Sequence, residues 1–291
     1  MNKIANSELM LNADGSIFHL HLHPEQLADT VVLVGDQGRA KRISEIFENL
    51  EFCLQSREFL SATGQYKGRR LTVLSTGIGT DNIDIVINEL DALVNIDLQT
   101  RLPKTTHNSL RLVRLGTCGA LQADIPIGSL LLSKISIGFD GLLNWYADRD
   151  KVSLLDYEAA FVQHMRWAKS LPAPYFVAAS EELVRRFAPI CISGMTISAP
   201  GFYGPQGRVL RLPLIDPDLL EKVESFRYRD DRICNFEMEG SAIAGLSALL
   251  GHQALTVCVA IANRYLQGSN TSYQDLMEGA IVKILDTLAA E

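Results

Sequence analysis

Short apolar runs alternate with helical patterns along nearly the whole chain, and this alternation restricts the fold more than any other feature of the sequence. Residues 31–34 and 71–76 form apolar runs typical of strands, whereas apolar residues recur at helical spacing from Ile83 to Val94. Further strands are predicted at 110–115, 128–133, 191–198 and 254–261, and further helices at 40–49, after Glu239 and at 272–290. The pattern predicts an α/β fold with a largely central sheet and helices on both faces.

The length and organisation of the chain favour a single domain. Its 291 residues suit one large α/β domain or two small ones, and they are enough for a substantial core. The sequence has no internal repeat, no low-complexity tract and no clear linker, and its most polar insertion, at 98–109, is expected to be a surface loop. We therefore predict one domain that covers residues 1–291.

Composition argues against several classes of partner. The formal net charge of −7 leaves no basic surplus for general binding of nucleic acid. No apolar run approaches the roughly 20 residues of a membrane span, and residues 1–8 lack the apolar core of a signal peptide. The five cysteines are odd in number, far apart and without a CxxC pair, so neither a zinc site nor a disulfide framework is indicated. The expected location is a reducing cytoplasm.

The histidines give little reason to expect a metal. His19, His21 and His23 alternate with apolar residues as an edge strand would, but no acidic residue nearby completes a ligand pattern. The other three histidines are expected on the surface or in loops: His107, His164 and His252. The sequence therefore predicts no metal site.

Two carboxylates, Glu237 and Glu239, precede a helix that otherwise has almost no polar residue. Burying an ionised carboxylate is costly unless a partner compensates it. The pair therefore either caps the helix, whose N-terminus favours negative charge, or awaits a ligand rich in hydroxyl groups. A carboxylate accepts two hydrogen bonds side by side, which suits the cis-diol of a ribose.

Three glycine turns follow predicted strands. In the first, Val34-Gly35-Asp36-Gln37-Gly38-Arg39, Gly35 and Arg39 suit an anion such as phosphate, although the turn is neither a Walker loop nor a dinucleotide fingerprint. The second, Arg114-Leu115-Gly116-Thr117-Cys118-Gly119, combines an arginine, a hydroxyl and exposed backbone, and the third is 75–82. Because ligands of open α/β sheets bind beyond the carboxyl ends of strands, the turns are candidates for one shared site. The requirements of turn geometry would also explain each of them taken alone.

Residues 202–208, Phe-Tyr-Gly-Pro-Gln-Gly-Arg, combine aromatic rings with the amide of Gln206 and the guanidinium of Arg208. A planar heterocycle fits such a segment, because a ring can stack on it while an amide offers both a donor and an acceptor to its edge. An ordinary Pro-Gly turn is the alternative interpretation.

Taken in order, these motifs resemble the nucleoside phosphorylase-I family. The resemblance rests on the glycine turn 35–39, Arg57-Glu58-Phe59, 75–79, 114–119, 202–208, Phe236-Glu237-Met238-Glu239 and Asn263-Arg264. It extends from Phe18 to about Arg264, and the chain is most similar to the uridine-specific members. The resemblance implies a three-layer α/β/α sandwich around a mixed, partly barrel-like sheet. It also implies phosphorolysis, in which a pyrimidine nucleoside and inorganic phosphate, the co-substrate, give free base and ribose 1-phosphate without a metal or organic cofactor.

The resemblance further implies a role for each matching residue. Phosphate would be held by Gly35, Arg39, Arg114 and Thr117, with Arg57 reaching the site of a neighbouring subunit. The ribose would be held by Met238 and Glu239, with Glu237 in support and His19 from across a dimer interface. The base would be bound by Phe202, Gln206 and Arg208. The residues expected to act in catalysis are Arg114, Gln206, Arg208 and Glu239.

Sites shared between subunits imply a homodimer, or a hexamer built from three dimers. The chain departs from the family pattern at Gln37, where proline is usual, and at Thr80-Asp81-Asn82, where many bacterial members have Gly-Pro-Ser near a monovalent-cation site. Purine-specific relatives have an acidic residue near the position of Asn263. The alternatives that remain open are a purine or broad-specificity phosphorylase, a nucleosidase that uses water, and a non-catalytic nucleoside sensor.

Overall fold

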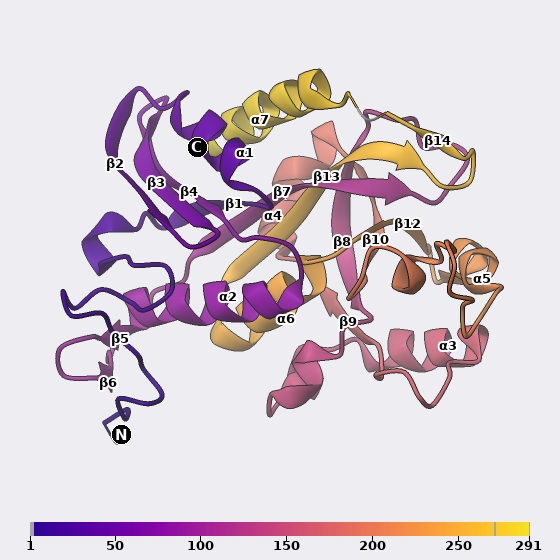
Figure 1. Ribbon diagram of the computed structural model, residues 1–291, viewed down its shortest axis with the longest axis horizontal. Helices are drawn as coiled ribbons and strands as arrows, with labels where there is room; N and C mark the ends of the chain where they lie inside the picture. The colour runs from indigo at the N-terminus through magenta and orange to yellow at the C-terminus, as the bar shows by residue number, and fades with distance from the viewer. Residues whose placement is uncertain (1–2, 271, 291) are drawn as a thin grey trace.

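The computed structural model describes residues 3–270 and 272–290, and Figure 1 shows a sheet with helices on both sides. The α-helices are α1 (Gln37–Ser44), α2 (Thr80–Asn95), α3 (Leu155–Met165), α4 (Glu181–Phe187), α5 (Leu219–Ser225), α6 (Gly240–Leu250) and α7 (Gln274–Ala289). The longer strands are β1 (Thr30–Val34), β2 (Asn49–Ser56), β3 (Phe59–Tyr66), β4 (Arg69–Ser75), β7 (Arg111–Ala120), β8 (Leu130–Gly138), β9 (Tyr175–Ala178), β10 (Ile192–Ser198), β12 (Asp231–Glu237) and β13 (Gln253–Asn263). Four strands have two residues each: β5 (Ile96–Asp97), β6 (Leu102–Pro103), β11 (Arg227–Tyr228) and β14 (Gly268–Ser269).

The sheet is mixed and partly closed. Strands β4, β1, β7 and β13 are parallel neighbours, and the antiparallel strands β3 and β2 extend one side. On the other side β8 runs antiparallel to β13, and β10 and β12 follow it in parallel pairs. Strand β12 also pairs with β7, with Asn235 opposite Ala120 and Phe236 opposite Gly119. This last pairing closes five strands into a ring, which confirms the predicted barrel-like sheet.

Strand β1 shows why the sheet needs helices on both faces. Its side chains alternate in direction, so Val31 and Leu33 enter the core that contains α2 and α6, whereas Val32 and Val34 enter the core that contains α1 and α7. In Figure 1 these two pairs of helices lie below and above the sheet. All five residues of the strand are buried, as expected for a parallel strand covered on both sides. The three-layer prediction is confirmed.

The described part of the chain offers no transmembrane candidate. Its longest helices, α2 and α7, have 16 residues each, and no helix there has the length and apolar character of a membrane span.

The helix predicted at 40–49 is wrong in its second half. Helix α1 begins at Gln37 because the side chain of Asp36 caps it, accepting the N–H of Arg39 at 2.8 Å. The helix ends at Ser44, and strand β2 begins at Asn49. The β2–β3 hairpin was not predicted from the sequence, since β2 is an outer strand of half-exposed residues without a buried apolar run.

The edge strand predicted around His19 is also wrong. The amide of Ile17 donates to the carbonyl of Leu22 at 3.0 Å, which closes a turn in place of a strand. The carboxylate of Glu89 on α2 accepts the amides of His19 and Leu20 at 2.9–3.1 Å and holds this turn against the helix. The predicted loop at 98–109 is partly correct, but it contains β6, which pairs with β5.

Candidate active site

One cleft, of about 1020 Å³, opens where several strands end. Its lining comes from the turn after β1, from β7, from the segment after β10, from the junction of β12 with α6 and from the segment that follows β13. Most of the residues predicted for the site line it: Gly35, Arg39, Arg114, Thr117, Phe202, Gln206, Arg208, Glu237, Met238 and Glu239. His19 and Arg57 are not among the lining residues.

Arg114 is a buried cation between two buried carboxylates. Its Nη2 pairs with Oε2 of Glu239, and its Nη1 lies 3.3 Å from Oε2 of Glu237. Burial lowers the pKa of Arg114, but the two carboxylates outweigh this effect, so that the pKa stands above its ordinary value. Burial raises the pKa of Glu239, although the charge of Arg114 opposes the shift. The cluster therefore carries two anions for one cation, and both carboxylates depend on Arg114.

Gly116 is required by the close approach of Arg114. Both residues are on β7 two positions apart, so they face the same side of the sheet. A Cβ atom at position 116 would lie 1.9 Å from Nη1 of Arg114 and 2.7 Å from its Cζ. The guanidinium therefore lies in the space that a side chain at 116 would fill, which explains the glycine in this motif.

Replacing Gly116 with alanine is expected to displace the guanidinium of Arg114. Overpacking a core costs about 1–3 kcal/mol, so the free energy of unfolding should fall by that amount in urea titrations. Binding of inorganic phosphate, measured by calorimetry, should weaken at the same time. Gly279→Ala in α7 is the control, since nothing lies within 4 Å of its Cβ position. Unchanged phosphate affinity in Gly116→Ala would contradict this account of the motif.

Glu237 caps helix α6. Its carboxylate accepts the amide of Glu239 at 2.9 Å and the amide of Gly240 at 2.9–3.0 Å, and it also accepts the hydroxyl of Ser198. Glu239 is bound differently, because its Oε1 accepts the amide of Gly79 at 2.8 Å while Oε2 faces Arg114. The φ of Gly79 is 99°, which glycine adopts without strain. The third glycine turn thus converges on the same cluster as the second.

Arg39 adds a second cation to this end of the cleft. Its side chain is 10% exposed, and its Nη1 donates to the carbonyl of Leu115 at 3.1 Å. Nη2 lies 3.1 Å from Oδ2 of Asp36, which also lines the cleft. Burial lowers the pKa of Arg39, although Asp36 opposes the shift. The first glycine turn therefore supplies a partly desolvated arginine close to the strand that carries Arg114.

Gln206 and Arg208 form a hydrogen-bonded pair at another part of the cleft. Nη1 of Arg208 donates to Oε1 of Gln206 and to the carbonyl of Phe202, both at 2.6 Å, and the guanidinium lies 3.8 Å from the centre of the Phe202 ring. Because arginine can only donate, the atom of the Gln206 amide that faces Arg208 is the oxygen. Burial and the neighbouring Arg264 lower the pKa of Arg208 to about 10, so that it remains charged at neutral pH.

Arg264 is a site residue that the sequence analysis named only as part of a motif. It lines the cleft, and its Nη1 donates to the carbonyl of Gln206 at 3.0 Å. Burial lowers its pKa. The sequence did give one indication of a role for Arg264, because the pair Asn263-Arg264 follows a strongly apolar strand. Nothing in the sequence showed, however, that this strand ends beside residue 206.

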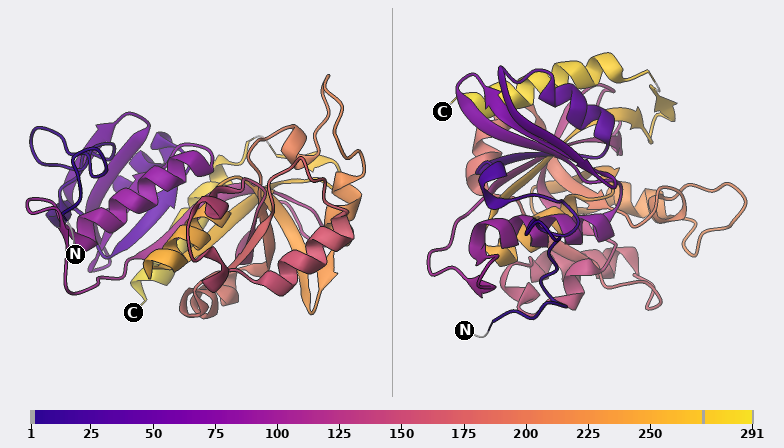
Figure 2. Two further views of the ribbon diagram at one scale, coloured as in Figure 1. Left: turned by 90° about the horizontal axis from the view of Figure 1, so that it is seen from below. Right: turned by 60° about the vertical axis from the view of Figure 1, so that its left-hand side comes forward.

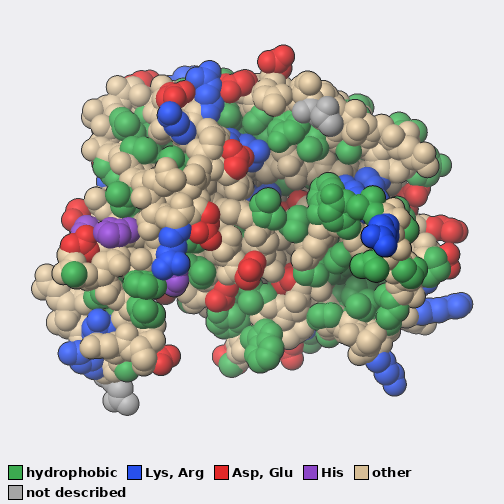
Figure 3. All heavy atoms as spheres, in the orientation of Figure 1, with side chains coloured by type: hydrophobic (Ala, Val, Ile, Leu, Met, Phe, Trp, Pro, Cys, Tyr) green, Lys and Arg blue, Asp and Glu red, His purple; other side chains and the backbone are tan. Residues whose placement is uncertain are grey.

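The segment after Gln206 projects from the body of the protein, as Figure 2 shows between β10 and α5. Several large apolar side chains on this segment and just before it are exposed: Phe202, Tyr203, Val209, Leu210, Leu212 and Ile215. Figure 3 shows hydrophobic side chains gathered on this part of the surface. Arg208 therefore lies at the root of a projecting loop, whereas Gln206 is buried.

His19 and Arg57 lie together outside the cleft. Nδ1 of His19 is 2.6 Å from Oε1 of Glu89, and the carbonyl of His19 accepts the hydroxyl of Ser56, the neighbour of Arg57. Arg57 has a φ of 55°, and its carbonyl accepts the side-chain amide of Gln37 at 2.7 Å. The residue that replaces the usual proline thus connects the first glycine turn to the turn that carries Arg57.

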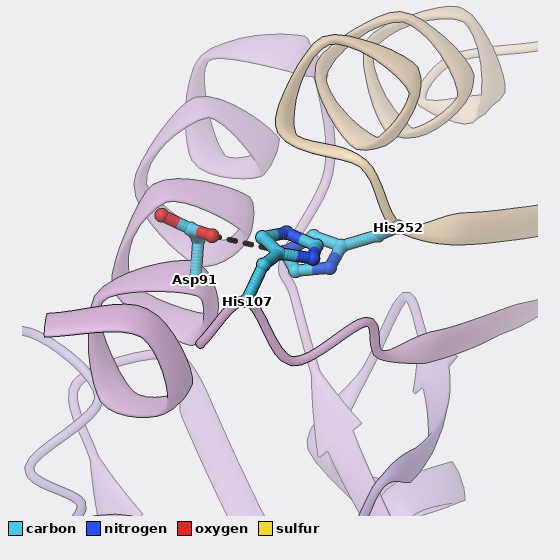
Figure 4. A group of neighbouring side chains, drawn as sticks. All are labelled: Asp91, His107 and His252. Atoms are coloured by element: carbon cyan, nitrogen blue, oxygen red, sulfur yellow. Dashed lines mark ion pairs between the residues drawn. The ribbon is translucent and has the colours of Figure 1, made fainter. Parts of the chain in front are cut away.

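A separate group, Asp91, His107 and His252, brings possible metal ligands within 4.8 Å of one another (Figure 4). His252 lies in the loop between α6 and β13, as the sequence allowed, but not on the surface, because its side chain is fully buried and its Nδ1 accepts the amide of Leu110 at 3.1 Å. With Nδ1 accepting, the proton of the ring is on Nε2, which is buried 3.3 Å from Oδ1 of Asp91 without a hydrogen bond to it. The rings of His107 and His252 are stacked at 26°, and Nε2 of His107 binds the carbonyl of Leu250. This geometry suits a structural role better than a metal site.

Comparisons with known proteins show which proteins the whole chain is similar to. A uridine phosphorylase from Thermococcus kodakarensis is 28% identical to the chain, over 91% of this chain and 83% of its own length. A DeoD-type purine nucleoside phosphorylase from Bacillus subtilis is also 28% identical, over 88% of this chain and 91% of its own length. A crystal structure of a Trypanosoma brucei nucleoside phosphorylase, described as showing uridine phosphorylase activity, superposes with a TM-score of 0.88 at 28% identity, covering 97% of this chain and 100% of its own.

The family model described as the phosphorylase superfamily matches residues 29–287, which include the cleft residues from Gly35 to Tyr273. The resemblance inferred from the motifs is therefore confirmed. This chain belongs to the phosphorylase superfamily, and it is a pentosyltransferase of the nucleoside phosphorylase type.

Proposed function

We propose that the protein catalyses the reversible phosphorolysis of uridine to uracil and ribose 1-phosphate. The observation that supports this most is the cleft itself, in which the cations Arg39 and Arg114, the carboxylate of Glu239 and the Gln206–Arg208 pair line one cavity. These groups match the three parts of the substrates: an anion, a diol and a polar heterocycle. Similarity to uridine phosphorylases from other organisms adds to the proposal.

At the phosphate end, two arginine forks and a hydroxyl would bind the dianion. Arg39 and Arg114 are both buried enough to interact strongly with an anion, and Thr117 and the backbone of Gly35 line the same region. Phosphate would bind the guanidinium of Arg114 in place of Glu239, which would then turn to the sugar. Glu239 and Met238 would then hold the ribose, with Glu237 in support.

At the base end, Gln206 and Arg208 would recognise uracil. The amide of Gln206 offers donors and a carbonyl with a second lone pair, which suits an edge of alternating carbonyl and N–H groups. The ring of Phe202, half exposed, would pack near the base. Because Arg208 is charged, it would stabilise the negative charge that the base acquires as it leaves.

The reaction then needs only positioning and electrostatics. The C1′–N1 bond breaks with oxocarbenium-like character, as in other glycosyl transfers, and the bond electrons go to the base. Phosphate held beneath the sugar captures C1′ and forms ribose 1-phosphate. Fixing both reactants in one cleft replaces a bimolecular encounter, which supplies part of the rate. The proposed route uses no protein nucleophile, metal or organic cofactor.

The positions of His19 and Arg57 support a homodimer with shared sites, either alone or as one of three dimers in a hexamer. They lie outside the cleft of their own subunit, yet they form one polar group on neighbouring segments. In the proposed dimer Arg57 would reach the neighbouring phosphate and His19 the neighbouring ribose. Measuring the molar mass in solution by light scattering tests this part; a monomer with full activity would contradict it.

Purine nucleosides are the second candidate substrates, because DeoD-type purine nucleoside phosphorylases are as similar in sequence as the uridine phosphorylases. Assays of base release from uridine and inosine, side by side with inorganic phosphate, distinguish the two. We expect uridine to be cleaved and inosine to be a poor substrate. Preferential cleavage of inosine would overturn the proposed base pocket.

Asn263 gives a sharper test of this preference. It is buried, its Nδ2 donates to the carbonyls of Gln122 and Ile125 at 3.0 and 2.8 Å, and its Oδ1 accepts the amide of Leu266 at 2.9 Å. Both polar atoms of the Asn263 side chain are therefore already hydrogen-bonded within the protein. Introducing the acidic residue found in purine-specific relatives removes both donors and directs a carboxylate at two carbonyls.

Asn263→Asp is therefore expected to destabilise the fold by about 1–3 kcal/mol for each carbonyl left without a donor, and to create no inosine cleavage. Urea unfolding and the uridine-to-inosine activity ratio measure the two effects. Asn270→Asp is the matched control, because it makes the same charge change in the cleft lining while its bond to the amide of Ser272 needs only an oxygen. A gain of inosine cleavage in a stable Asn263→Asp variant would show that this residue reads the base.

A further inference from the structure

Ser198, at the end of β10, lies behind the charged cluster and does not line the cleft. Its hydroxyl is completely buried and has two partners, since it accepts the amide of Ser241 at 2.8 Å and donates to Oε1 of Glu237. A hydroxyl has a single proton, so accepting from one group while donating to the other fixes its orientation. Ser198 and Glu237 are also register partners on adjacent parallel strands.

The bonds of Glu237 leave it little capacity for a ligand. A carboxylate offers about four lone-pair sites. In this structure they face the hydroxyl of Ser198, the amides of Glu239 and Gly240, and the guanidinium of Arg114. Glu237 is therefore held by the protein itself, with little capacity left for a ligand.

Glu239 differs from Glu237 in this respect. It has one amide partner, Gly79, and its other oxygen is held by Arg114. Glu239 therefore keeps lone-pair sites for ribose hydroxyls, and turning toward the sugar would loosen its bond to Arg114. A buried arginine left without a counter-ion is strongly unfavourable, so a carboxylate has to stay with Arg114 whenever phosphate is absent. Glu237 is the one that can, because its other bonds hold it in position.

We propose that Ser198 is a positioning residue, whose hydroxyl holds Glu237 against Arg114 so that Arg114 stays in place for phosphate while Glu239 turns to the ribose. This inference rests on the proposed phosphate and ribose sites. Ser241, whose amide binds Ser198, is itself held by a further hydrogen bond. Its hydroxyl donates to Oδ2 of Asp140 at 2.8 Å, and the hydroxyl of Tyr175 donates to Oδ1 of the same carboxylate at 2.9 Å. The start of α6 is thereby fixed on the side away from the cleft.

The test compares Ser198→Ala with Ser133→Ala. Ser133 is equally buried, on the adjacent strand β8, and its hydroxyl donates to that of Thr196 at 2.7 Å, so the control also removes one buried hydroxyl. Calorimetric titration of the intact protein with inorganic phosphate alone gives Kd without any nucleoside. Losing a hydrogen bond to a charged group should weaken phosphate binding about tenfold or more in Ser198→Ala, and leave it unchanged in Ser133→Ala. Ser198→Thr retains the hydroxyl and should restore the affinity.

Equal phosphate affinity in Ser198→Ala and the parent would overturn the proposal, as would an equal loss in Ser133→Ala. If Ser198→Ala does not fold, Ser198→Thr decides the question, and a folded threonine variant with tenfold weaker phosphate binding would also overturn it. Because the readout is phosphate binding, the uridine assignment is tested separately. Weakened phosphate binding together with a parent protein that cleaves only inosine would uphold the role of Ser198 and reject the proposed base.

Discussion

Replacing Arg208 with alanine is expected to lower kcat for uridine phosphorolysis by about 10²–10³-fold, the loss seen when one donor that stabilises a developing anion is removed. The reason is that Arg208, in the proposed role, provides positive charge next to the leaving base; it also orients the amide of Gln206, whose oxygen accepts from it at 2.6 Å. In the proposed site phosphate binds at the other arginines, so the KM for phosphate should change by less than about threefold, as for a group that acts on the transition state. Steady-state kinetics with each substrate varied in turn measures both quantities.

Arg211→Ala is the control for this prediction. Arg211 is exposed and lies three positions further along the same projecting loop, so its removal changes the net charge equally without touching Gln206. Arg208→Lys should give an intermediate kcat, because lysine keeps the charge but not the planar fork. A variant Arg208→Ala with normal kcat and a raised KM for phosphate would show that Arg208 has been assigned to the wrong substrate.

Replacing Arg114 with alanine should have the largest effect on the fold. The side chains of Arg114, Glu237 and Glu239 are 5%, 1% and 4% exposed, so the substitution leaves two buried carboxylates without their cation. Removing one partner of a buried ion pair costs about 3–5 kcal/mol in the free energy of unfolding. Urea unfolding at neutral pH measures this loss, and phosphate binding should disappear in the folded fraction.

Adding Glu239→Gln to Arg114→Ala provides the matched comparison. The second substitution removes one of the two uncompensated charges, so the double variant should be more stable than the single one, although still inactive. Glu239 is the better choice for this test, since Glu237 also caps α6. A double variant less stable than Arg114→Ala would contradict the view that the two carboxylates depend on this arginine.

The alternation of strands and helices was predictable because each element has its own periodic pattern. Strand β1 and helices α2, α6 and α7 lie close to their predicted positions. Hairpin β2–β3 was missed since its outer strand is half exposed and has no buried apolar run. The closure of the five-stranded ring could not be predicted for a different reason. The pairing of Asn235 with Ala120 joins residues far apart in sequence, and no local sequence pattern encodes it.

The candidate site was predictable as a set of motifs but not as a geometry. The turns at 35–39 and 114–119 and the pair Glu237 and Glu239 do line one cleft, as the sequence led us to expect. The sequence offered capping or ligand binding for the two carboxylates, and the structure divides these roles, because Glu237 caps α6 while Glu239 faces Arg114. Ser198 carried no signal at all, since a serine that ends an apolar strand is common and its partner is reached only through the parallel pairing of β10 with β12.

The measurement that tests the central claim most directly is the amount of uracil and of ribose 1-phosphate formed from uridine, with and without inorganic phosphate. The account predicts that uracil appears only when phosphate is present and that the two products form in equal amounts. Uracil release without phosphate, with free ribose as the other product, would make the protein a nucleosidase and contradict the proposed role of Arg39 and Arg114. No release under either condition would contradict the proposed reaction of uridine itself.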